Sequence, residues 1–381
     1  MRFSHIEIEN WRNFGHVDID VANRAFLVGP NASGKSNFLD ALRFLRDIVT
    51  PGGGFEQAVE SRGGVSRIRN LAARRNPDIV IRVTLADKDE PDWSYTIAFG
   101  QDARHPVLKE EQIWCGDKLL LSRPDQADEK DPARLRQTLL EQTFANAEFR
   151  AIAEFFGSIR YYHIVPQLVR DPDRSTGRRN DPYGGDFLEQ ISATSPRTRE
   201  ARLRKISGVL KVAVPQLQGF KIDKDSAGVP HLYGNYQHWR PQGAWQTEVD
   251  FSDGTLRLLG LLWAILDGLG PVLMEEPELS LHPAIVRRIP QMMLQAQKQS
   301  NRAARQVFIS THSSDLLSDE GISADEVLLV RPSEDGSTIQ IGAHIEEVVT
   351  QLQAGLTVAE AVMPRTTPQG LEELPLFDRG R

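Results

Sequence analysis

The segment Gly29-Pro30-Asn31-Ala32-Ser33-Gly34-Lys35-Ser36 fits the pattern G-x-x-x-x-G-K-S/T at every fixed position. The four apolar residues before it, 25–28, predict a short buried strand, and apolar side chains recur at helical spacing after it. A strand, a glycine-rich turn and a helix in this order form a phosphate-binding loop. The sequence therefore predicts a nucleoside triphosphate site between that strand and that helix.

The residue types of this loop suit a phosphate chain and a magnesium ion. Two glycines let the backbone turn so that successive N–H groups face phosphate oxygens, and the helix N-terminus adds positive charge there. We expect Lys35 to reach the β- and γ-phosphates and Ser36 to offer its hydroxyl to Mg²⁺, which predicts ATP and Mg²⁺ as cofactors. The expected nucleotide-binding residues of this segment are Gly29, Pro30, Asn31, Ala32, Ser33, Gly34, Lys35, Ser36 and Asn37.

The composition is that of an ordinary globular chain. It has 381 residues, of which 40% are hydrophobic and 25% charged, which suits one large or two ordinary domains. The longest apolar run, residues 258–266, is flanked by Arg257 and Asp267 and is better explained as a core helix than as a membrane span. Because the N-terminus has no apolar signal region, we expect a cytoplasmic protein without membrane contact. The single cysteine, Cys115, cannot form an internal disulfide.

Basic residues gather locally although the formal net charge is −7. Residues 61–77 contain five arginines and no acid, and residues 160–205 also carry more basic than acidic side chains. A local basic surface of this kind can contact the phosphates of double-stranded DNA, and Arg62 and Arg67 are our candidates for such contacts. Solvated loops with intramolecular ion pairs explain the same pattern equally well, so both interpretations stay open.

Alternating and helical patterns indicate a mixed α/β fold. Residues 3–21 alternate as a hairpin, and residues 79–85, 93–99 and 107–121 continue as antiparallel strands. We therefore expect an antiparallel sheet beside the parallel nucleotide-binding sheet. Further along the chain, the patterns predict a helical region at 131–156, a strand at 159–165, a loop at 171–185, a helix at 197–212 and strands at 220–222 and 245–251.

Acidic residues at the end of a buried strand form the second half of the predicted site. The strand 272–274 ends in Glu275-Glu276-Pro277-Glu278. A carboxylate there can hold Mg²⁺ through water, and its neighbour can orient or deprotonate the attacking water. We assign these roles to Glu275 and Glu276, respectively. A solvated turn would be the usual explanation of adjacent acids, but the phosphate-binding loop upstream favours the catalytic one.

Two histidines lie downstream of these acids. His312 follows the apolar strand 307–310, and we interpret it as a sensor of the γ-phosphate. His282 lies at a helix start before a proline, where a structural or subunit-contacting role is expected.

The segment 252–257, Ser-Asp-Gly-Thr-Leu-Arg, precedes the apolar helix that leads to the acidic strand end.

The order of these segments resembles that of ABC-type ATPases, within them the RecF/SMC/OLD branch, and most of all the standalone AAA-type ATPases of bacterial defence and toxin operons. The opening Ile8-Glu9-Asn10-Trp11-Arg12-Asn13-Phe14, Asn31 in the loop, and Glu-Glu-Pro-Glu followed by Leu-His-Pro are typical of that branch. The segments that correspond to Walker A, signature, Walker B, D-loop and H-loop are 29–36, 252–257, 272–278, 279–282 and 311–313.

The resemblance implies a head-to-tail homodimer in which each ATP lies between the Walker A loop of one copy and the signature segment of the other. Ser252 and Gly254 would then close on the γ-phosphate from across the interface. The resemblance also implies a Q-loop glutamine that contacts nucleotide and metal, for which Gln167 is the candidate. Glu275 stands where many relatives have aspartate, which keeps the carboxylate but lengthens its side chain by one methylene.

The predicted fold class is an α/β P-loop ATPase head with mixed parallel and antiparallel sheets and a helical insertion. We expect the head to span 1–345, with a nucleotide-binding lobe at 1–125, an insertion at 126–215 and a signature and Walker B lobe at 216–345. A C-terminal helix and exposed tail would follow at 346–381. The acidic-apolar stretch 372–377 of that tail is a candidate docking segment.

The resulting hypothesis is an ATP-hydrolysing switch that regulates a DNA-directed or partner effector, in phage defence or a toxin system. Since the chain ends soon after the ATPase core, we expect no C-terminal Toprim nuclease, and any nuclease would be a partner. A RecF-like clamp in DNA maintenance is the alternative. A transporter subunit fits less well, because the segment from Phe251 to Arg257 is not Leu-Ser-Gly-Gly-Gln. A kinase would have no use for the signature segment.

Overall fold

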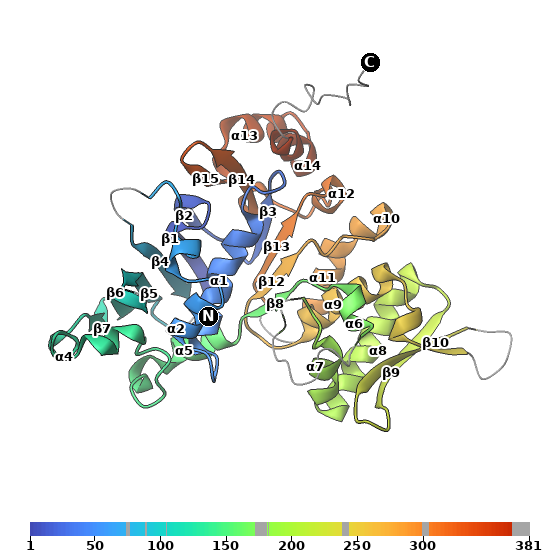
Figure 1. The fold of residues 1–381 in the computed structure, drawn as a ribbon. Coiled ribbons are helices and arrows are strands. Elements are labelled where there is room, and N and C mark those ends of the chain that lie inside the picture. The colour runs from blue at the N-terminus through green and yellow to red at the C-terminus, as the bar shows by residue number, and fades with distance from the viewer. Residues whose placement is uncertain are drawn as a thin grey trace, which may run out of the picture.

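The computed structural model of the chain describes residues 1–73, 77–87, 90–103, 105–171, 181, 183–237, 244–298 and 305–367. Its centre is one mixed sheet, to which twelve strands of the described ranges belong in the order β7-β6-β5-β4-β1-β2-β15-β14-β3-β13-β12-β8 (Figure 1). The strands of this sheet are β1 (Arg2–Trp11), β2 (Phe14–Asp20), β3 (Arg24–Val28), β4 (Ile79–Ala86), β5 (Trp93–Asp102), β6 (His105–Cys115), β7 (Lys118–Arg123), β8 (Arg160–Tyr162), β12 (Val272–Glu275), β13 (Val307–Thr311), β14 (Val327–Ser333) and β15 (Gly336–Ile341).

The parallel half of the sheet is buried on both faces. In β3, Ala25 and Leu27 belong to one apolar core, whereas Phe26 and Val28 belong to the core on the opposite face. Such continuous apolar strands are typical of parallel sheets covered by helices on both sides. Helix α1 (Lys35–Val49) contributes its apolar residues to the first core, and α9 (Asp253–Leu266) contributes its own to the second.

The antiparallel half extends from β1 to β7. The hairpin predicted for residues 3–21 is confirmed, because β1 and β2 pair antiparallel from His5–Asp20 to Trp11–Phe14. The strands predicted at 79–85, 93–99 and 107–121 also form and pair antiparallel in chain order. They are not a separate sheet, however, because β2 pairs with β15 and β15 with β14, which joins both halves into one sheet.

A second body of helices and a small sheet lies on the other side of the molecule from β5, β6 and β7 (Figure 1). It consists of α7 (Phe187–Ala193), α8 (Pro196–Ala213) and a sheet in the order β11-β10-β9. The strands are β9 (Leu217–Lys224), β10 (Pro230–Tyr236) and β11 (Ala244–Thr247). Apolar residues of α7, α8, β9 and β10 join the same core as α9, so this body packs against the signature helix.

Several sequence predictions for this middle part need correction. Residues 131–156 are not one helical region: short 3-10 turns precede α5 (Arg150–Gly157), the main helix there. The strand predicted at 159–165 ends at Tyr162 and is followed by α6 (Pro166–Val169), since proline is well suited to the first turn of a helix. Strand β10 was not predicted, and β11 ends before residues 248–250, which form a 3-10 turn.

The remaining helices are short. Buried side chains of α13 and α14, among them Val348, Ala361 and Val362, join the core around α9, so these C-terminal helices pack against the sheet. The docking segment predicted at 372–377 lies outside the described residues. No helix of the described ranges is long and apolar enough to cross a membrane. The other helices are α2 (Phe55–Glu60), α3 (Val65–Ile68), α4 (Gln126–Lys130), α10 (Pro283–Val286), α11 (Ile289–Lys298), α12 (Ser314–Leu317), α13 (Glu346–Gln353) and α14 (Val358–Val362).

Candidate nucleotide-binding and hydrolysis site

Three neighbouring parallel strands end at the candidate site. Ser310 of β13 pairs with Leu27 of β3 on one side and with Glu275 of β12 on the other. The loop 29–36, the acidic residues after β12 and the segment after β13 therefore leave the sheet at one edge. This register brings together three of the sequence segments to which we assigned roles in binding and hydrolysis.

Close contacts explain both glycines of the loop. A Cβ atom on Gly29 would lie 2.3 Å from the carbonyl oxygen of Val330, and one on Gly34 would lie 2.1 Å from the side-chain nitrogen Nδ2 of Asn13. Gly34 also has a φ of +108°, in the region that favours glycine. Any larger residue at either position would displace the loop from the end of β3.

Lys35 lies across the loop at the start of α1. Its Nζ donates hydrogen bonds to the carbonyl oxygens of Gly29, at 2.8 Å, and Pro30, at 3.0 Å. Burial lowers the pKa of Lys35, while the carboxylates of Glu276, Glu278 and Glu275 act against that shift. These contacts place the ammonium group between the loop and the acidic strand end.

Asn13 holds the loop through its side-chain amide, a role that the sequence did not reveal. Its Nδ2 donates to the carbonyl oxygen of Ser33 and to the hydroxyl of Ser337, both at 2.7 Å. Its Oδ1 accepts a hydrogen bond from Asn37 at 2.7 Å. Asn37, predicted to bind nucleotide, thus has its amide directed toward Asn13. The only signal in the sequence was the segment 8–14, which we used for the family resemblance.

Glu275 contacts residues of the neighbouring edge strand. Its Oε2 lies 3.6 Å from Nδ1 of His163, and its carboxylate lies close enough to the phenol of Tyr161 to act on it electrostatically. Burial, followed by the charge of Glu275, raises the pKa of Tyr161, so this phenol stays protonated and can donate. Neither His163 nor Tyr161 was predicted, although both lie in the stretch 159–165 that the sequence indicated as a strand.

Glu276 and His312 lie together, as the sequence predicted from their strand ends. Nδ1 of His312 is 3.2 Å from Oε1 of Glu276. The backbone of Glu276 is in the left-handed region with a φ of 42°, and its N–H donates to the carbonyl oxygen of Ser310 at 2.9 Å. A non-glycine residue in this region is uncommon and is held there by its surroundings.

Glu278 is a buried carboxyl that the sequence prediction left without a role. Its exposed fraction is 5%, and its Oε1 accepts a hydrogen bond from the hydroxyl of Thr311 at 2.5 Å. Its Oε2 has no hydrogen-bond partner within the described ranges, and burial raises the pKa of the carboxyl. The hydroxyl of Ser33 in the loop is likewise buried and unpartnered in that part of the chain.

The signature segment forms the start of α9. The Oγ of Ser252 accepts a hydrogen bond from the N–H of Thr255 at 3.2 Å, and so caps the helix. A Cβ atom on Gly254 would lie 2.8 Å from the carbonyl oxygen of Ser280, which explains the glycine by close approach to the D-loop. Within the described residues, no hydrogen bond or ion pair joins Ser252 or Gly254 to the loop 29–36 of the same chain.

Gln167 lies beside the signature segment. It is exposed on α6, and its Nε2 is 3.5 Å from Oδ2 of Asp253. Arg170 at the end of the same helix donates to Oδ1 of Asp253 and to the carbonyl oxygen of Phe251, each at 2.6 Å. The helix α6 and the signature segment are thereby linked.

Two further predictions can be compared with the structure. The prediction that Arg62 contacts DNA phosphates is wrong. The Arg62 side chain is only 7% exposed and donates hydrogen bonds to Asp40 and Asp47. The guanidinium of Arg62 is occupied by these internal ion pairs. Of the two predicted DNA contacts, Arg62 and Arg67, only Arg67 is exposed. His282 accepts a hydrogen bond from the N–H of Ala284 at 3.2 Å and caps α10, in keeping with a structural role.

The fold and the arrangement of these segments define a P-loop ATPase head of the ABC type. A family model described as "AAA domain, putative AbiEii toxin, Type IV TA system" matches residues 24–319, and the chain belongs to this family. The family resemblance and the fold class predicted from the sequence are therefore confirmed.

Two further kinds of relative were found. A segment of 47 residues is 53% identical to Endonuclease GajA of Bacillus cereus (strain VD045), and spans 12% of this chain and 8% of that protein. The chain thus matches less than a tenth of this curated relative. An SMC head bound to the C-winged helix domain of ScpA is similar in fold, with a TM-score of 0.51 at 14% identity over 89% of this chain and 98% of that one. The SMC head domain from Thermotoga maritima gives a TM-score of 0.47 at 16% identity, over 90% of this chain and 99% of that one.

Proposed function

We propose that this chain binds ATP with Mg²⁺ and hydrolyses it, and that ATP closes two copies of the chain head to tail. The observation that carries the proposal is the meeting of Lys35, Glu276 and His312 at the ends of three adjacent parallel strands. A cation, a carboxylate and an imidazole there are suited to hold the phosphates, to activate water and to contact the transferred phosphoryl group.

The chemistry of the donor groups fits a triphosphate with its metal. The buried hydroxyl of Ser33 lacks a partner in the described part of the chain and is available to a phosphate oxygen. The N-terminus of α1 and the ammonium of Lys35 supply positive charge at the same point. The Ser36 hydroxyl and the Glu275 carboxylate are oxygen ligands of the kind that Mg²⁺ prefers. When bound, Mg²⁺ would neutralise charge on the phosphates.

Two neighbours orient the proposed metal ligand and extend the site. The protonated phenol of Tyr161 lies beside the Glu275 carboxylate, and we propose that it donates to that carboxylate and limits the directions from which it can reach a metal. Gln167 remains our candidate for the family's glutamine, but it faces Asp253.

Water activation is assigned to Glu276. Its carboxylate contacts His312 at 3.2 Å, so an imidazole that bonds the γ-phosphate also positions the base. The left-handed backbone of Glu276 directs its side chain away from the strand path that Glu275 continues. We propose that Glu276 takes the proton of the attacking water and that His312 contacts the transferred phosphoryl group.

Closure by a second copy is supported by the position of the signature. Because Ser252 and Gly254 make no hydrogen bond to the loop of their own chain within the described ranges, they are available to the nucleotide of a partner. ATP would then form part of the dimer contact, and hydrolysis would loosen it. The family description and the short match to GajA favour a role in regulating a partner effector, in phage defence or a toxin system.

Mixing two inactive variants tests the shared site. Lys35→Ala should lose hydrolysis because it lacks the phosphate ligand, and Ser252→Arg should lose it because the bulky side chain blocks closure. In a mixed dimer, one of the two sites combines a native loop with a native signature. We expect an equimolar mixture to recover about a quarter of native ATP turnover, since about half the dimers are mixed and each has one intact site.

The control for this experiment is the double variant Lys35→Ala/Ser252→Arg mixed with Lys35→Ala, which contains no intact loop and should stay inactive. Folding of each variant is checked by thermal unfolding, and ATP binding by Ser252→Arg is measured directly. If both single variants are folded and Ser252→Arg binds ATP, but their mixture recovers no ATP turnover, each site belongs to one chain and the head-to-tail proposal fails.

Asn13→Ala is expected to weaken ATP binding, with KM rising about tenfold or more and kcat changing less. The substitution removes three hydrogen bonds, which join Asn13 to Ser33 of the loop, to Asn37 of α1 and to Ser337 of β15, and each is worth roughly 0.5–1.5 kcal/mol. Steady-state kinetics over a range of ATP concentrations measures the two constants. Asn37→Ala removes only one of these bonds and should have a smaller effect; equal KM values for Asn13→Ala and the native chain would contradict the role of Asn13.

A further inference from the structure

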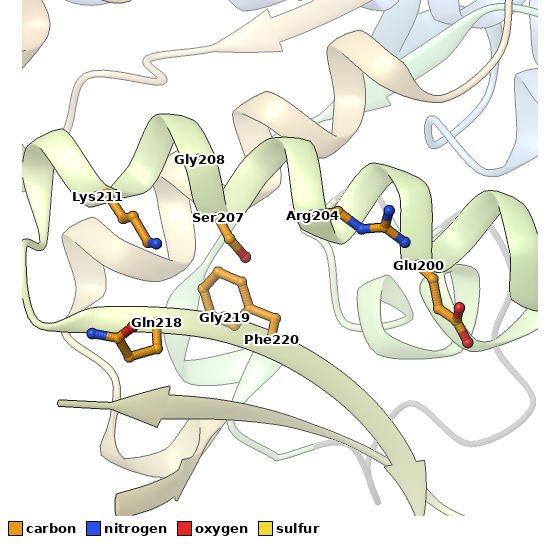
Figure 2. Close-up of a pocket in the computed structure, with 8 residues that line it drawn as sticks. All are labelled: Glu200, Arg204, Ser207, Gly208, Lys211, Gln218, Gly219 and Phe220. Atoms are coloured by element: carbon orange, nitrogen blue, oxygen red, sulfur yellow. The ribbon is translucent and has the colours of Figure 1, made fainter. Parts of the chain in front are cut away.

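A groove runs between α8 and the edge strand β9, in the body that packs against the signature helix. Its volume is about 370 Å³. Figure 2 shows the helix along one side and the strand along the other, with the ring of Phe220 between them. The residues that line the groove are Glu200, Arg204, Ser207, Gly208, Lys211, Gln218, Gly219 and Phe220.

Two glycines keep this groove open. Gly208 lies in the interior of α8 and Gly219 lies in β9, positions where glycine weakens a helix or strand. A Cβ atom at either position would meet nothing within 4 Å, and neither residue has a positive φ that would call for glycine. Backbone geometry and packing therefore do not explain these glycines, whereas space for a ligand does.

The groove and its surroundings are basic. Arg204 and Lys211 lie seven residues apart on α8, and their side chains make no hydrogen bond or ion pair within the described part of the chain. Residues 196–237 contain eight basic and three acidic side chains, a net charge of +5, whereas the rest of the chain carries −12 because the whole carries −7. Such a concentration of positive charge in an acidic protein favours an anionic ligand.

Aromatic side chains surround Lys221, a further basic residue of β9, on the face of the small sheet opposite to Phe220. The pairing of Lys221 with Tyr233 and of Gly219 with Asn235 puts these residues on one face of the small sheet. On that face, Nζ of Lys221 lies 5.0 Å from the ring centre of Tyr233 and 4.8 Å from that of Trp245. Trp245 is 49% exposed, which is unusual for so large an apolar ring.

We propose that the groove and this aromatic face bind a single strand of nucleic acid. Arg204 and Lys211 would contact its phosphates in the groove, and the exposed ring of Trp245 would stack on a base where the nucleic acid passes around the edge strand β9 to the other face of the sheet. The basic residues extend beyond the groove along α8 and β9, which suits a chain of nucleotides better than one mononucleotide. An acidic peptide would satisfy the charges but would make no use of the rings.

The groove is connected to the signature through ring contacts. Phe220 packs edge to face on Phe251 with ring centres 5.9 Å apart, and Phe251 directly precedes Ser252. Arg170 holds the carbonyl oxygen of Phe251 at 2.6 Å. A nucleic acid that displaces Phe220 would therefore move Phe251, the residue next to the signature serine Ser252. This regulatory consequence rests on the proposed ATP-dependent closure, whereas binding in the groove does not.

Fluorescence anisotropy with a labelled 20-nucleotide oligo(dT), measured without ATP at several salt concentrations, tests the binding itself. Arg204→Glu/Lys211→Glu should lower affinity at least tenfold. The slope of log affinity against log salt should fall by about 1.4, since each lost phosphate contact removes about 0.7 for single strands. Gly208→Leu puts a side chain into the groove at a position where a Cβ atom meets nothing within 4 Å, and it should lower affinity while leaving the melting temperature unchanged or higher.

The matched control is Lys118→Glu/Arg136→Glu, the same charge change at exposed residues near β7, on the other side of the molecule. Native affinity in both groove variants overturns the proposal. It is also overturned if oligo-glutamate of matched length binds in a groove-dependent way while oligo(dT) does not, which would indicate an acidic peptide partner. Because ATP is absent, these results are independent of the proposed hydrolysis.

The connection to the signature has its own test. Phe220→Leu removes the ring contact to Phe251 but keeps an apolar side chain in the groove. Oligo(dT) should change the rate of ATP hydrolysis by the native chain, and this response should be lost in Phe220→Leu although the variant still binds the oligonucleotide. A full response in the variant would show that Phe220 does not transmit binding to the signature.

Discussion

Glu276→Gln is expected to bind ATP normally, to lose hydrolysis by at least about a hundredfold and to accumulate a dimer. The amide cannot accept the proton of the attacking water, and a positioned general base contributes about 10²- to 10⁴-fold. Its carbonyl oxygen can still accept a hydrogen bond from His312, so the site should keep its shape. ATP that is bound and not hydrolysed remains in the interface, and the closed dimer persists.

Phosphate release and light scattering after size-exclusion chromatography measure the two parts of this expectation. Both are recorded with ATP and Mg²⁺, and the dimer should disappear when ADP replaces ATP. Glu320→Gln makes the same chemical change at an exposed glutamate and should behave as the native chain. A Glu276→Gln protein that hydrolyses ATP at the native rate contradicts the role of the base, and one that binds ATP but stays monomeric contradicts the dimer.

Arg123→Met is expected to lower the free energy of unfolding by about 3–5 kcal/mol, the usual cost of breaking a buried ion pair. Arg123 is 2% exposed and donates to Glu111 at 3.0 Å and to Asp128 at 2.8 and 2.9 Å. It also donates to the carbonyl oxygens of Arg134 and Gln137. Methionine would leave two buried carboxylates without their cation, while filling much of the same volume.

Urea unfolding of the two proteins measures this difference. Arg134→Met is the control. The Arg134 side chain is partly exposed and makes a longer contact of 3.5 Å with Asp128, so this substitution should lower the free energy of unfolding by less than about 1 kcal/mol. The folded Arg123→Met protein should hydrolyse ATP at the native rate, since β7 and β12 lie near opposite edges of the sheet. Equal stability of the two variants would show that the buried pair contributes nothing net.

Local patterns were sufficient for the parts of the site that each lie within one segment. The loop 29–36 could be predicted because its glycines, Lys35 and Ser36 follow one another between a strand and a helix. Glu276 and His312 could be predicted because both end apolar strands, and parallel strands in a sheet end at one edge. In each case the prediction needed only the fold class and the neighbouring residues.

Long-range contacts account for what could not be predicted. Asn13 contacts a loop about twenty residues away, and nothing local to the hairpin indicates this partner. Arg62 was misinterpreted because its partners Asp40 and Asp47 lie on a different helix, so an internal ion pair resembled an exposed basic run. Gln167 was expected at the end of a strand, but that strand ends five residues earlier, at Tyr162. The contact of His163 with Glu275 also joins separate parts of the chain and was not predicted.

The left-handed backbone at Glu276 implies a trade-off between activity and stability at that position. Glycine, and to a lesser degree asparagine, adopt this conformation at lower cost than glutamate, but neither could serve as the proposed base. A library of variants at position 276 that is selected for heat resistance alone would thus enrich variants that keep the fold but lack the proposed ATP hydrolysis. Melting temperature is therefore a poor guide to which engineered copies of this ATPase head still turn over.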